Sequence, residues 1–407
     1  MIVPPHASNR PDWLDEQIRL FDPRQPIEST WLPPSSWYTE PAFYDLERST
    51  VFKNNWLIAA RADQLRAPGD YVATTIAGEP IVVVRGADGV LRAFYNVCRH
   101  HAAMVMVGEG NADNMVCPYH GWTYALDGAL RSAPELGGVR DFDRECFGLA
   151  PVHVAQWAEF VFVHRGENPA PAGDGLDDLA RRLEAMNSGA LRFVRRLRYT
   201  IGCNWKVFVD NYLDGGYHVA HLHEGLAGQL DMATYHTEVF DRYSIQSGAG
   251  AGTAGGPGAG TAEGAGNPER HAGAALRASG SPEEAQSSRG DFAERVGDRV
   301  LYAWLYPNFM INRYGPWMDT NWVLPRGEDE TEVLFDYYLD ATHAGDEAFI
   351  AKSLAASDVV QQEDIDICGS VQRGLGSSSY DRGRYSVRRE MGEHHFHRLL
   401  AADFRAR

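Results

Sequence analysis

The pattern of hydrophobic and polar positions changes near residue 175 and divides the chain into two parts. In residues 50–165, short runs of β-branched and aromatic residues such as 80–85 and 160–164 alternate with Gly-containing turns. Such runs are typical of strands, so this part is predicted to be a small all-β domain. In residues 175–407, helical segments mix with longer strands such as 333–339, which predicts an α+β domain.

Two segments depart from this pattern. Residues 1–49 are rich in Pro and Trp and are predicted to form an irregular N-terminal arm that leads into a short helix near Pro41. Residues 247–290 are dominated by Gly, Ala, Ser, Glu and Pro, and they offer almost no apolar bulk to offset the loss of chain entropy. We therefore predict a mobile surface insertion here, with a lid that orders on substrate binding as the alternative.

Composition and charge narrow the class of protein. With 407 residues, 44% of them hydrophobic, the chain is long enough for two domains with a large core and no disulfides. Its net charge of −17 argues against nucleic-acid or anionic-membrane partners and at most suits a basic redox partner. Five sparse cysteines are typical of a reducing compartment, and there is no apolar run of about 18 residues. We expect no membrane span and a cytoplasmic location.

Two of the cysteines form a metal-binding pattern with two histidines. Cys98-x-His100 and Cys117-x-x-His120 are separated by sixteen residues, and each pair supplies one thiolate and one imidazole. Structural zinc is one candidate, but zinc sites more often pair Cys with Cys and His with His. The alternating order favours a Rieske-type [2Fe–2S] cluster, in which Cys98 and Cys117 hold one iron and His100 and His120 the other. His101 is then a neighbour of the cluster rather than a ligand.

A second group of possible ligands follows a predicted amphipathic helix that ends at a pair of glycines. It contains His218, His221 and His223, close to Asp210 and Asp214. Two imidazoles and one carboxylate can hold Fe(II) on one side and leave positions open for O2. The spacing alone does not decide whether His221 or His223 pairs with His218. The carboxylate is also left open, among four in a later acidic helix: Asp358, Glu363, Asp364 and Asp366.

Five further stretches carry a resemblance to a known family: 210–219, 306–321, 371–375, 380–385 and 394–397. Together with the two metal motifs, they make the chain similar to the α subunits of the Rieske ring-hydroxylating oxygenases from about residue 37 onwards, and more narrowly to the choline monooxygenases. The resemblance implies a catalytic domain of the helix-grip fold with an antiparallel sheet. It also implies a head-to-tail homotrimer.

The resemblance assigns roles to individual residues. It implies that the second iron is bound by His218, His223 and Asp364. In the wider family, a carboxylate three residues before the first of these histidines bridges it to a cluster histidine of the neighbouring subunit, but Gly215 stands at that place here. Asp214 is the expected substitute and Asp210 the second choice, and either would face His120 of the next chain.

The implied reaction is the hydroxylation of a C–H bond in a quaternary ammonium or related amine substrate with O2. Electrons from NAD(P)H would pass through a separate flavin and iron–sulfur reductase to the cluster and then to Fe(II). Such a cation is bound best by a box of aromatic side chains. The candidates for this box are Trp304, Tyr306, Tyr314 and Trp317. For each of them, ordinary packing in the hydrophobic core is the alternative. The competing functions are an aromatic ring-hydroxylating dioxygenase and, with the second domain merely structural, a Rieske electron carrier.

Overall fold

The structure is a computed structural model that describes residues 11–223, 230–250 and 297–406. Most of the insertion predicted at 247–290 therefore lies outside the described residues, although its first three residues end a strand of the second domain. Within the described ranges, no helix is long and apolar enough to cross a membrane.

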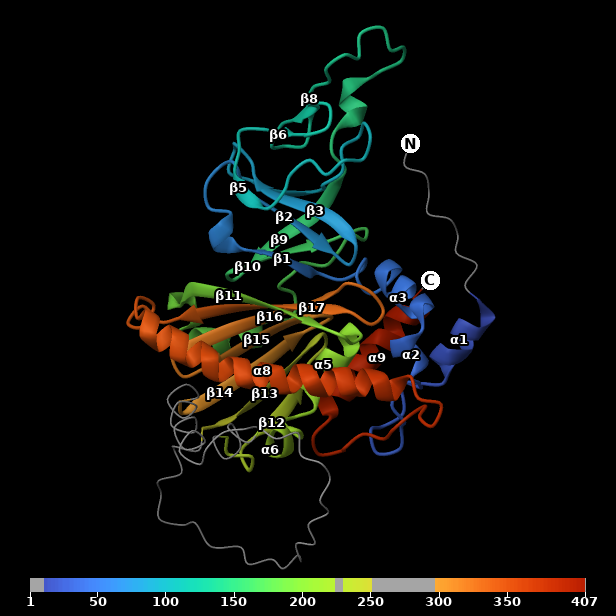
Figure 1. The fold of residues 1–407 in the computed structure, drawn as a ribbon, viewed down its shortest axis with the longest axis vertical. Coiled ribbons are helices and arrows are strands. Elements are labelled where there is room, and N and C mark those ends of the chain that lie inside the picture. Colours follow the sequence, from blue (N-terminus) through green and yellow to red (C-terminus); the bar gives the residue numbers. More distant parts are fainter. Residues whose placement is uncertain (1–10, 224–229, 251–296, 407) are drawn as a thin grey trace, which may run out of the picture.

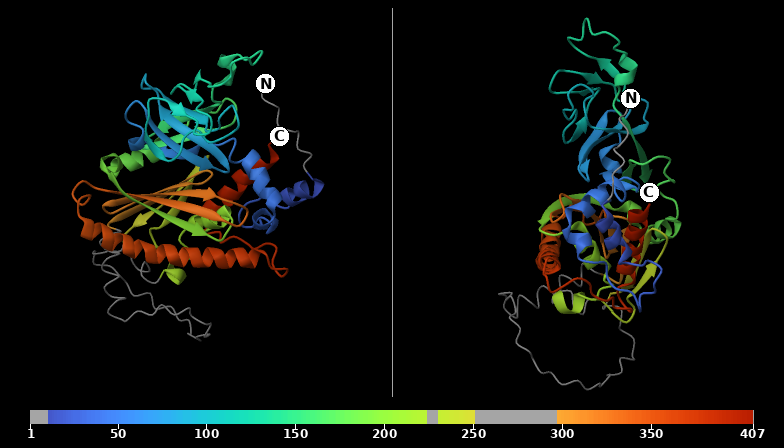
Figure 2. Two further views of the ribbon diagram at one scale, coloured as in Figure 1. Left: turned by 45° about the horizontal axis from the view of Figure 1, so that its top comes forward. Right: turned by 90° about the vertical axis from the view of Figure 1, so that its right-hand side faces the viewer.

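The predicted all-β domain is confirmed and contains two antiparallel sheets (Figure 1). The larger sheet has the order β1-β10-β9-β4-β3-β2-β5, and its strands are β1 (Leu57–Arg61), β2 (Asp70–Ile76), β3 (Glu79–Arg85), β4 (Leu91–Tyr95), β5 (Glu109–Asn111), β9 (Pro151–Trp157) and β10 (Phe160–His164). The smaller sheet consists of β6 (Met115–Val116), β7 (Thr123–Tyr124) and β8 (Leu130–Ser132). This small sheet lies at the end of the domain that points away from the rest of the molecule (Figures 1 and 2).

The second domain is α+β, as predicted, and is built on one antiparallel sheet with the order β11-β17-β16-β15-β14-β13-β12. The strands are β11 (Arg192–Ile201), β12 (His236–Val239), β13 (Tyr243–Ala249), β14 (Arg299–Leu305), β15 (Phe309–Tyr314), β16 (Trp317–Pro325) and β17 (Thr331–Leu339). Its helices are α4 (Asp177–Ala185), α5 (Trp205–Leu213), α6 (Val219–Leu222), α8 (Glu347–Leu375) and α9 (Met391–Arg405).

The two faces of this sheet have different neighbours. One face packs against α4 and against β1 and β10 of the β domain, through an apolar cluster that includes Phe160 and Ile311. The long helix α8 crosses the other face, together with α5 (Figures 1 and 2). Because side chains alternate along a strand, Asn312 of β15 and Asp319 of β16 point to this second face. A polar site can therefore form between the sheet and the two helices.

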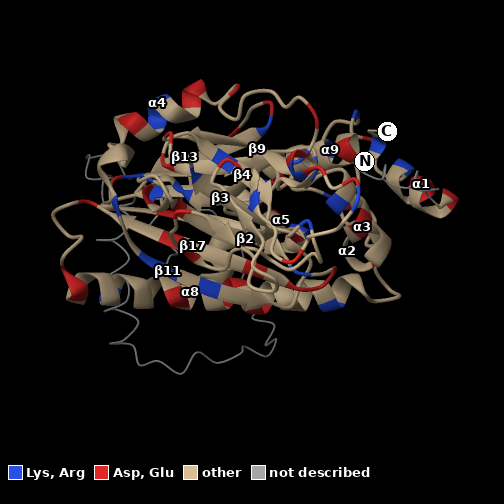
Figure 3. Cartoon of the chain, turned by 90° about the horizontal axis from the view of Figure 1, so that it is seen from above, with Lys and Arg blue, Asp and Glu red and all other residues tan. Residues whose placement is uncertain are grey.

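On the side of the molecule that Figure 3 shows, the described acidic residues are not gathered in one place. In the view from above, acidic and basic positions are mixed along α4 and α8 (Figure 3). Among the residues described on this side, no continuous basic stripe is present for nucleic acid.

The described part of the N-terminal arm is more regular than its composition suggested. It contains α1 (Asp12–Arg19), α2 (Ser36–Thr39) and α3 (Pro41–Ser49), the last of which is the helix expected near Pro41. The rings of Trp37 and Phe43 lie with their centroids 4.9 and 5.6 Å from that of Phe404 in α9. The prediction of an irregular arm is corrected here, because Trp37 and Phe43 are buried against the C-terminal helix and hold two of the short helices in place.

A buried ion pair joins the arm to helix α5. Glu47 of α3 and Lys206 of α5 contact each other with fully buried side chains, and Nε1 of Trp205 donates a hydrogen bond of 2.7 Å to Glu47. Burial raises the pKa of Glu47 and lowers the pKa of Lys206, so each charge depends on the other. We expect Lys206→Met to lower the free energy of unfolding by about 3–5 kcal/mol, because it leaves Glu47 buried without its cation.

Urea unfolding followed by circular dichroism measures this loss. The double variant Lys206→Met/Glu47→Leu removes both charges and is expected to recover most of it. If the single variant is as stable as the double variant, the ion pair does not anchor the arm.

Candidate metal centres and substrate cavity

The four residues predicted to hold the cluster lie on two loops of the β domain. Cys98 and His100 follow β4, whereas Cys117 and His120 lie between β6 and β7. Both cysteines are buried, and the ring centroids of the two histidines are 4.8 Å apart. His120 is exposed, so this edge of the group faces outwards. The fold thus brings all four residues to one end of the domain.

The chemistry of these residues fits a [2Fe–2S] cluster. Nδ1 of His100 is buried and has no hydrogen-bond partner in the described part of the chain, as suits a ring nitrogen that binds metal. The His100 ring stacks on Trp122 with a centroid distance of 4.9 Å, which holds its orientation. Both loops are closed by backbone hydrogen bonds of 2.8 Å, from N of Cys98 to O of Ala103 and from N of Cys117 to O of Trp122.

Tyr124 contacts one of the two cysteines. Its hydroxyl oxygen lies 3.3 Å from Sγ of Cys98 and accepts a hydrogen bond from the backbone N–H of Arg99. Burial, and then the contact with Cys98, raises the pKa of Tyr124, so the phenol stays protonated and can donate to a thiolate. Hydrogen bonds to the sulfurs raise the reduction potential of an iron–sulfur cluster.

We therefore expect Tyr124→Phe to lower the cluster potential by on the order of tens of millivolts. A redox titration followed by visible absorption measures the shift. Tyr71→Phe is the matched control, because the Tyr71 hydroxyl contacts the backbone carbonyl of Val107 instead of a sulfur. Equal potentials in Tyr124→Phe and the control would show that this hydroxyl does not tune the cluster.

The second group of predicted ligands lies where α5 ends and α6 begins. Gly215 and Gly216 have φ angles of 69° and 72°, which other residues rarely adopt. A Cβ at position 215 would also overlap the carbonyl oxygen of Arg389. The turn places His218, directly before α6, beside His223, directly after it, with ring centroids 4.9 Å apart. The glycine pair thus lets the two imidazoles face one point.

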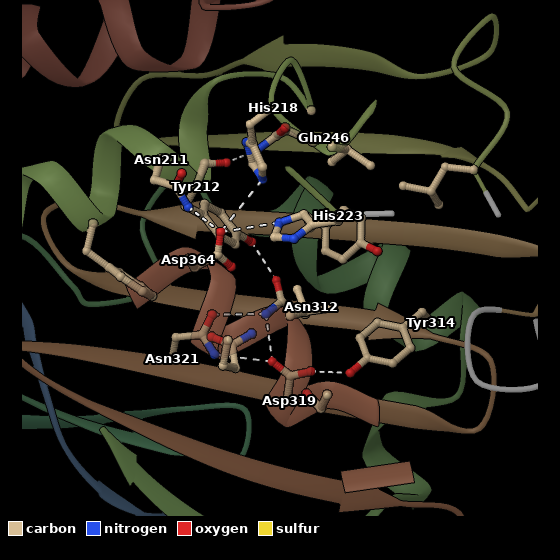
Figure 4. A pocket seen from close by; sticks show the side chains of 18 of the residues that line it. Asn211, Tyr212, His218, His223, Gln246, Asn312, Tyr314, Asp319, Asn321 and Asp364 are labelled. Atoms are coloured by element: carbon tan, nitrogen blue, oxygen red, sulfur yellow. Dashed lines mark hydrogen bonds and ion pairs between the residues drawn. The ribbon is translucent and has the colours of Figure 1, made fainter. Parts of the chain in front are cut away.

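Asp364 of α8 completes this group (Figure 4). Its Oδ1 lies 3.3 Å from Nε2 of His223 and 4.0 Å from Nε2 of His218. The three ligand atoms all lie within 4.8 Å of one another. Nδ2 of Asn211 donates a hydrogen bond of 2.9 Å to the same carboxylate and fixes it. Two imidazoles and one carboxylate that converge in this way fit Fe(II) in a facial triad.

Two further carboxylates hold the outer nitrogens of the histidines. Oδ2 of Asp214 lies 2.6 Å from Nδ1 of His218, and Oε2 of Glu363 lies 2.7 Å from Nδ1 of His223. Such contacts fix the tautomer, so that each Nε2 lone pair is directed towards the metal position. His221 is exposed and does not belong to this group.

Asp214 and Asp210, the two candidates for a bridge between metal sites, have separate surroundings. Besides contacting a ligand histidine, Asp214 accepts hydrogen bonds of 2.9 to 3.1 Å from the consecutive backbone N–H groups of 216–218. Asp210 instead accepts a hydrogen bond of 2.8 Å from Tyr38 and lies 3.1 Å from Nε2 of His397. The structure therefore brings only Asp214 to the second metal site.

A cavity of about 170 Å³ lies over the three ligands, between the sheet, α5 and α8. Six aromatic side chains line it: Phe208, Tyr212, Tyr235, Tyr302, Tyr314 and Phe335. Burial above all raises the pKa of Tyr212 well above 10, so its hydroxyl is a neutral donor. Among the described residues, the lining includes no Lys or Arg. Such a lining suits an organic cation better than an anion.

Only one of the four aromatic residues expected to form a cation box, Tyr314, lines this cavity. Trp304 packs against a phenylalanine of α9, with ring centroids 5.4 Å apart, and Trp317 stacks on a phenylalanine near the start of α8 at 6.0 Å. Tyr306 donates a hydrogen bond of 2.8 Å to a carboxylate of α9. The prediction is corrected for these three, because α9 covers Trp304 and Tyr306, the latter in the turn after β14, and the start of α8 covers Trp317.

Sequence analysis did not single out several residues of the cavity. Tyr302 lies two positions before Trp304 on strand β14, so the alternation of side chains along a strand places both on the same face of the sheet. On this pattern alone, they are equal candidates for lining the cavity. Asp319 lies in strand β16, which is buried along its whole length. A carboxylate in the middle of a buried strand is itself a signal, because burying it is costly.

Comparisons with known proteins agree with this geometry. The model of the ring hydroxylating alpha subunit (catalytic domain) matches residues 188–404, and that of the Rieske [2Fe-2S] domain matches residues 55–143. The chloroplastic choline monooxygenase of Arabidopsis thaliana is 41% identical over 95% of this chain and 86% of its own length. The carnitine monooxygenase oxygenase subunit of Escherichia coli (strain K12) is 32% identical over 93% of this chain and 95% of its own length.

Solved structures show the same fold. The quaternary ammonium Rieske monooxygenase CntA in complex with L-carnitine superposes with a TM-score of 0.73 at 27% identity, over 92% of this chain and 96% of that one. Naphthalene 1,2-dioxygenase from Rhodococcus sp. superposes with a TM-score of 0.71 at 20% identity, over 96% of this chain and 97% of that one, which is a likeness of fold alone.

The chain therefore belongs to the Rieske ring-hydroxylating oxygenase α subunits. It is a non-haem iron oxidoreductase that incorporates oxygen from O2, and its two domains imply a [2Fe–2S] cluster and a mononuclear iron. The predicted class is confirmed, and the match to the catalytic domain removes the alternative of an electron carrier. Within this family, the chain is similar to the choline monooxygenases.

Proposed function

We propose that this oxygenase hydroxylates a C–H bond of a small quaternary ammonium substrate related to choline. The observation that carries the proposal is the aromatic cavity directly over His218, His223 and Asp364. The faces of aromatic rings attract quaternary ammonium groups, and no Lys or Arg of the described lining opposes a cation. The relatives named choline monooxygenase and carnitine monooxygenase support the same class of substrate.

The reaction consumes O2, two electrons and two protons, converts C–H into C–OH and releases water. Fe(II) held by the triad would supply the activation of O2, and the [2Fe–2S] cluster would supply single electrons. The protein chain itself binds the metal centres and the substrate and orients them. Asp214 and Glu363 hold the two imidazoles in place, and the aromatic rings hold the cation with one carbon towards the triad. With choline, the product is an aldehyde hydrate.

Electrons are proposed to arrive from the cluster of a neighbouring chain in a homotrimer. Strand β6, beside the loop that carries His120, lies at one end of the molecule, and α6, beside the triad, lies at the other (Figures 1 and 2). A route within one chain would have to cross the whole molecule. The exposed His120 and the carboxylate of Asp214 are the groups expected to meet across the subunit boundary. A separate flavin and iron–sulfur reductase that oxidises NAD(P)H would reduce the cluster.

Oxygen uptake with NADH and a generic reductase tests the proposal. Choline, carnitine, glycine betaine and simple aromatic hydrocarbons are compared at equal concentrations. We expect uptake with one or more of the quaternary ammonium compounds, with one O2 consumed per substrate converted. Oxidation of an aromatic hydrocarbon without oxidation of any of these cations would contradict the proposal.

A further inference from the structure

Asp319 lies in a polar row that crosses the floor of the cavity. Gln246, Tyr302, Asn312 and Asp319 are direct partners on the consecutive strands β13, β14, β15 and β16. All four line the cavity, so they share the face of the sheet beneath α5 and α8. Asp319 and the iron ligand Asp364 are the carboxylates that the described lining contains.

Neutral donors orient the Asp319 carboxylate. Its Oδ2 accepts hydrogen bonds from Nδ2 of Asn312 at 2.7 Å and from Nδ2 of Asn321 at 3.2 Å, and its Oδ1 accepts one from the hydroxyl of Tyr314. The hydroxyl of Tyr212 donates to Oδ1 of Asn312 at 2.7 Å, which turns the Asn312 amide so that its N–H groups face Asp319. The side chain therefore has a fixed place in the cavity.

Burying the carboxylate of Asp319 at this position lowers the stability of the fold. Asp319 is only 4% exposed and stands in a nine-residue strand that is buried along its whole length. Burying a carboxylate in such surroundings lowers stability, even where hydrogen bonds offset part of the cost. A charge kept in a ligand cavity at this cost is a candidate for binding a ligand of opposite charge.

We propose that Asp319 binds the cationic head of the substrate and makes the enzyme select a charged quaternary ammonium compound over a neutral molecule of the same shape. This inference rests on the proposed function and assigns its charge recognition to one residue. In Figure 4, Asn312 lies between Asp364 and Asp319. A small cation anchored at Asp319, among the rings of Tyr302 and Tyr314, leaves its other end directed towards the iron ligands.

Anaerobic binding to the reduced holoenzyme tests the proposal without turnover. The two probes are choline and 3,3-dimethylbutan-1-ol, which replaces the ammonium nitrogen by carbon and keeps the shape. We expect Asp319→Asn to weaken choline binding by about 10- to 100-fold and to change binding of the neutral alcohol by less than about 3-fold. Asp319→Glu keeps the charge and is expected to keep a preference for choline.

A matched control removes the same charge outside the cavity. Asp358 lies on the exposed side of α8, where its carboxylate accepts a hydrogen bond from Tyr199. Asp358→Asn should leave the affinities for choline and for the neutral alcohol unchanged. Asp319→Ser removes the charge through a smaller side chain and carries the same expectation if Asp319→Asn does not fold. Cluster absorption and iron content report the folded holoenzyme in every variant.

Each outcome decides between the two proposals. A wild type that prefers choline, with the preference lost in Asp319→Asn or Asp319→Ser, supports the role of Asp319. A wild type that prefers choline, with the preference kept in these variants, overturns the role of Asp319 and leaves the proposed function in place. A wild type that binds both probes equally, or binds neither, also overturns the role of Asp319, and the oxygen-uptake comparison then decides the proposed function separately.

Discussion

His223→Ala is expected to reduce substrate oxidation by more than about 1,000-fold and to remove one iron per chain while the [2Fe–2S] cluster stays intact. His223 is almost fully buried, and its Nε2 lies 3.3 Å from the carboxylate of Asp364. Alanine leaves one imidazole and one carboxylate, a set too small to hold Fe(II) firmly. Iron analysis is expected to fall from about three to about two irons per chain, with an unchanged visible spectrum of the cluster.

The matched control is His221→Ala, because His221 lies two residues before His223, within the short helix α6, and is exposed. It is expected to keep both the iron content and the rate of oxidation. If His221→Ala loses iron and His223→Ala keeps it, the ligand assignment at α6 is reversed. If His223→Ala loses activity but keeps all its iron, the residue acts in another way.

The cluster ligands were the part of the site that the sequence best indicated, because their geometry is local. The cluster residues lie in two short loops closed by their own backbone hydrogen bonds, so spacing alone defines them. The choice between His221 and His223 was different. It depends on how the chain turns at Gly215 and Gly216, and the positive φ angles of that turn are a property of the folded backbone.

The substrate cavity was harder to predict, because it is assembled from strands far apart in the sequence. Gln246 and Asp319 belong to one row only through the register of four strands. Trp304 and Tyr302 were equivalent by alternation, and the packing of α9 decides which of them reaches the cavity. Trp37 of the arm was equally ambiguous, since its burial depends on Phe404 near the other end of the chain.

The departure at Gly215 has a physical explanation. A side chain at this position would overlap the carbonyl oxygen of Arg389, so the family's bridging carboxylate has no room there. Asp214 lies one residue earlier, and its contact with Nδ1 of His218 at 2.6 Å reaches the same ligand from the end of α5. We therefore propose that Asp214 takes the place of the family's bridging carboxylate.

Asp214→Asn is accordingly expected to slow substrate oxidation by about 100-fold or more while both metal sites remain loaded. Oδ1 of the asparagine can still accept the backbone N–H groups of residues 216 and 217, so the turn before α6 should persist. Its amide nitrogen replaces Oδ2, which in the aspartate accepts from the backbone N–H of His218 and contacts Nδ1 of the same residue. The amide lacks the negative charge that we propose links His218 to a cluster histidine of the neighbouring chain. Electrons should then remain on the cluster, and stopped-flow absorption after mixing reduced enzyme with substrate and O2 is expected to show slow cluster reoxidation.

Asp210→Asn is the control. It shows whether slow electron transfer in Asp214→Asn comes from the loss of a bridging carboxylate or merely from the loss of one negative charge near α5. Asp210 contacts Tyr38 and His397 and no iron ligand, so its variant should reoxidise the cluster within about 3-fold of the wild-type rate. Slow reoxidation in Asp210→Asn, with a normal rate in Asp214→Asn, would place the bridge at Asp210. Normal rates in both variants would mean that electrons reach His218 without either carboxylate.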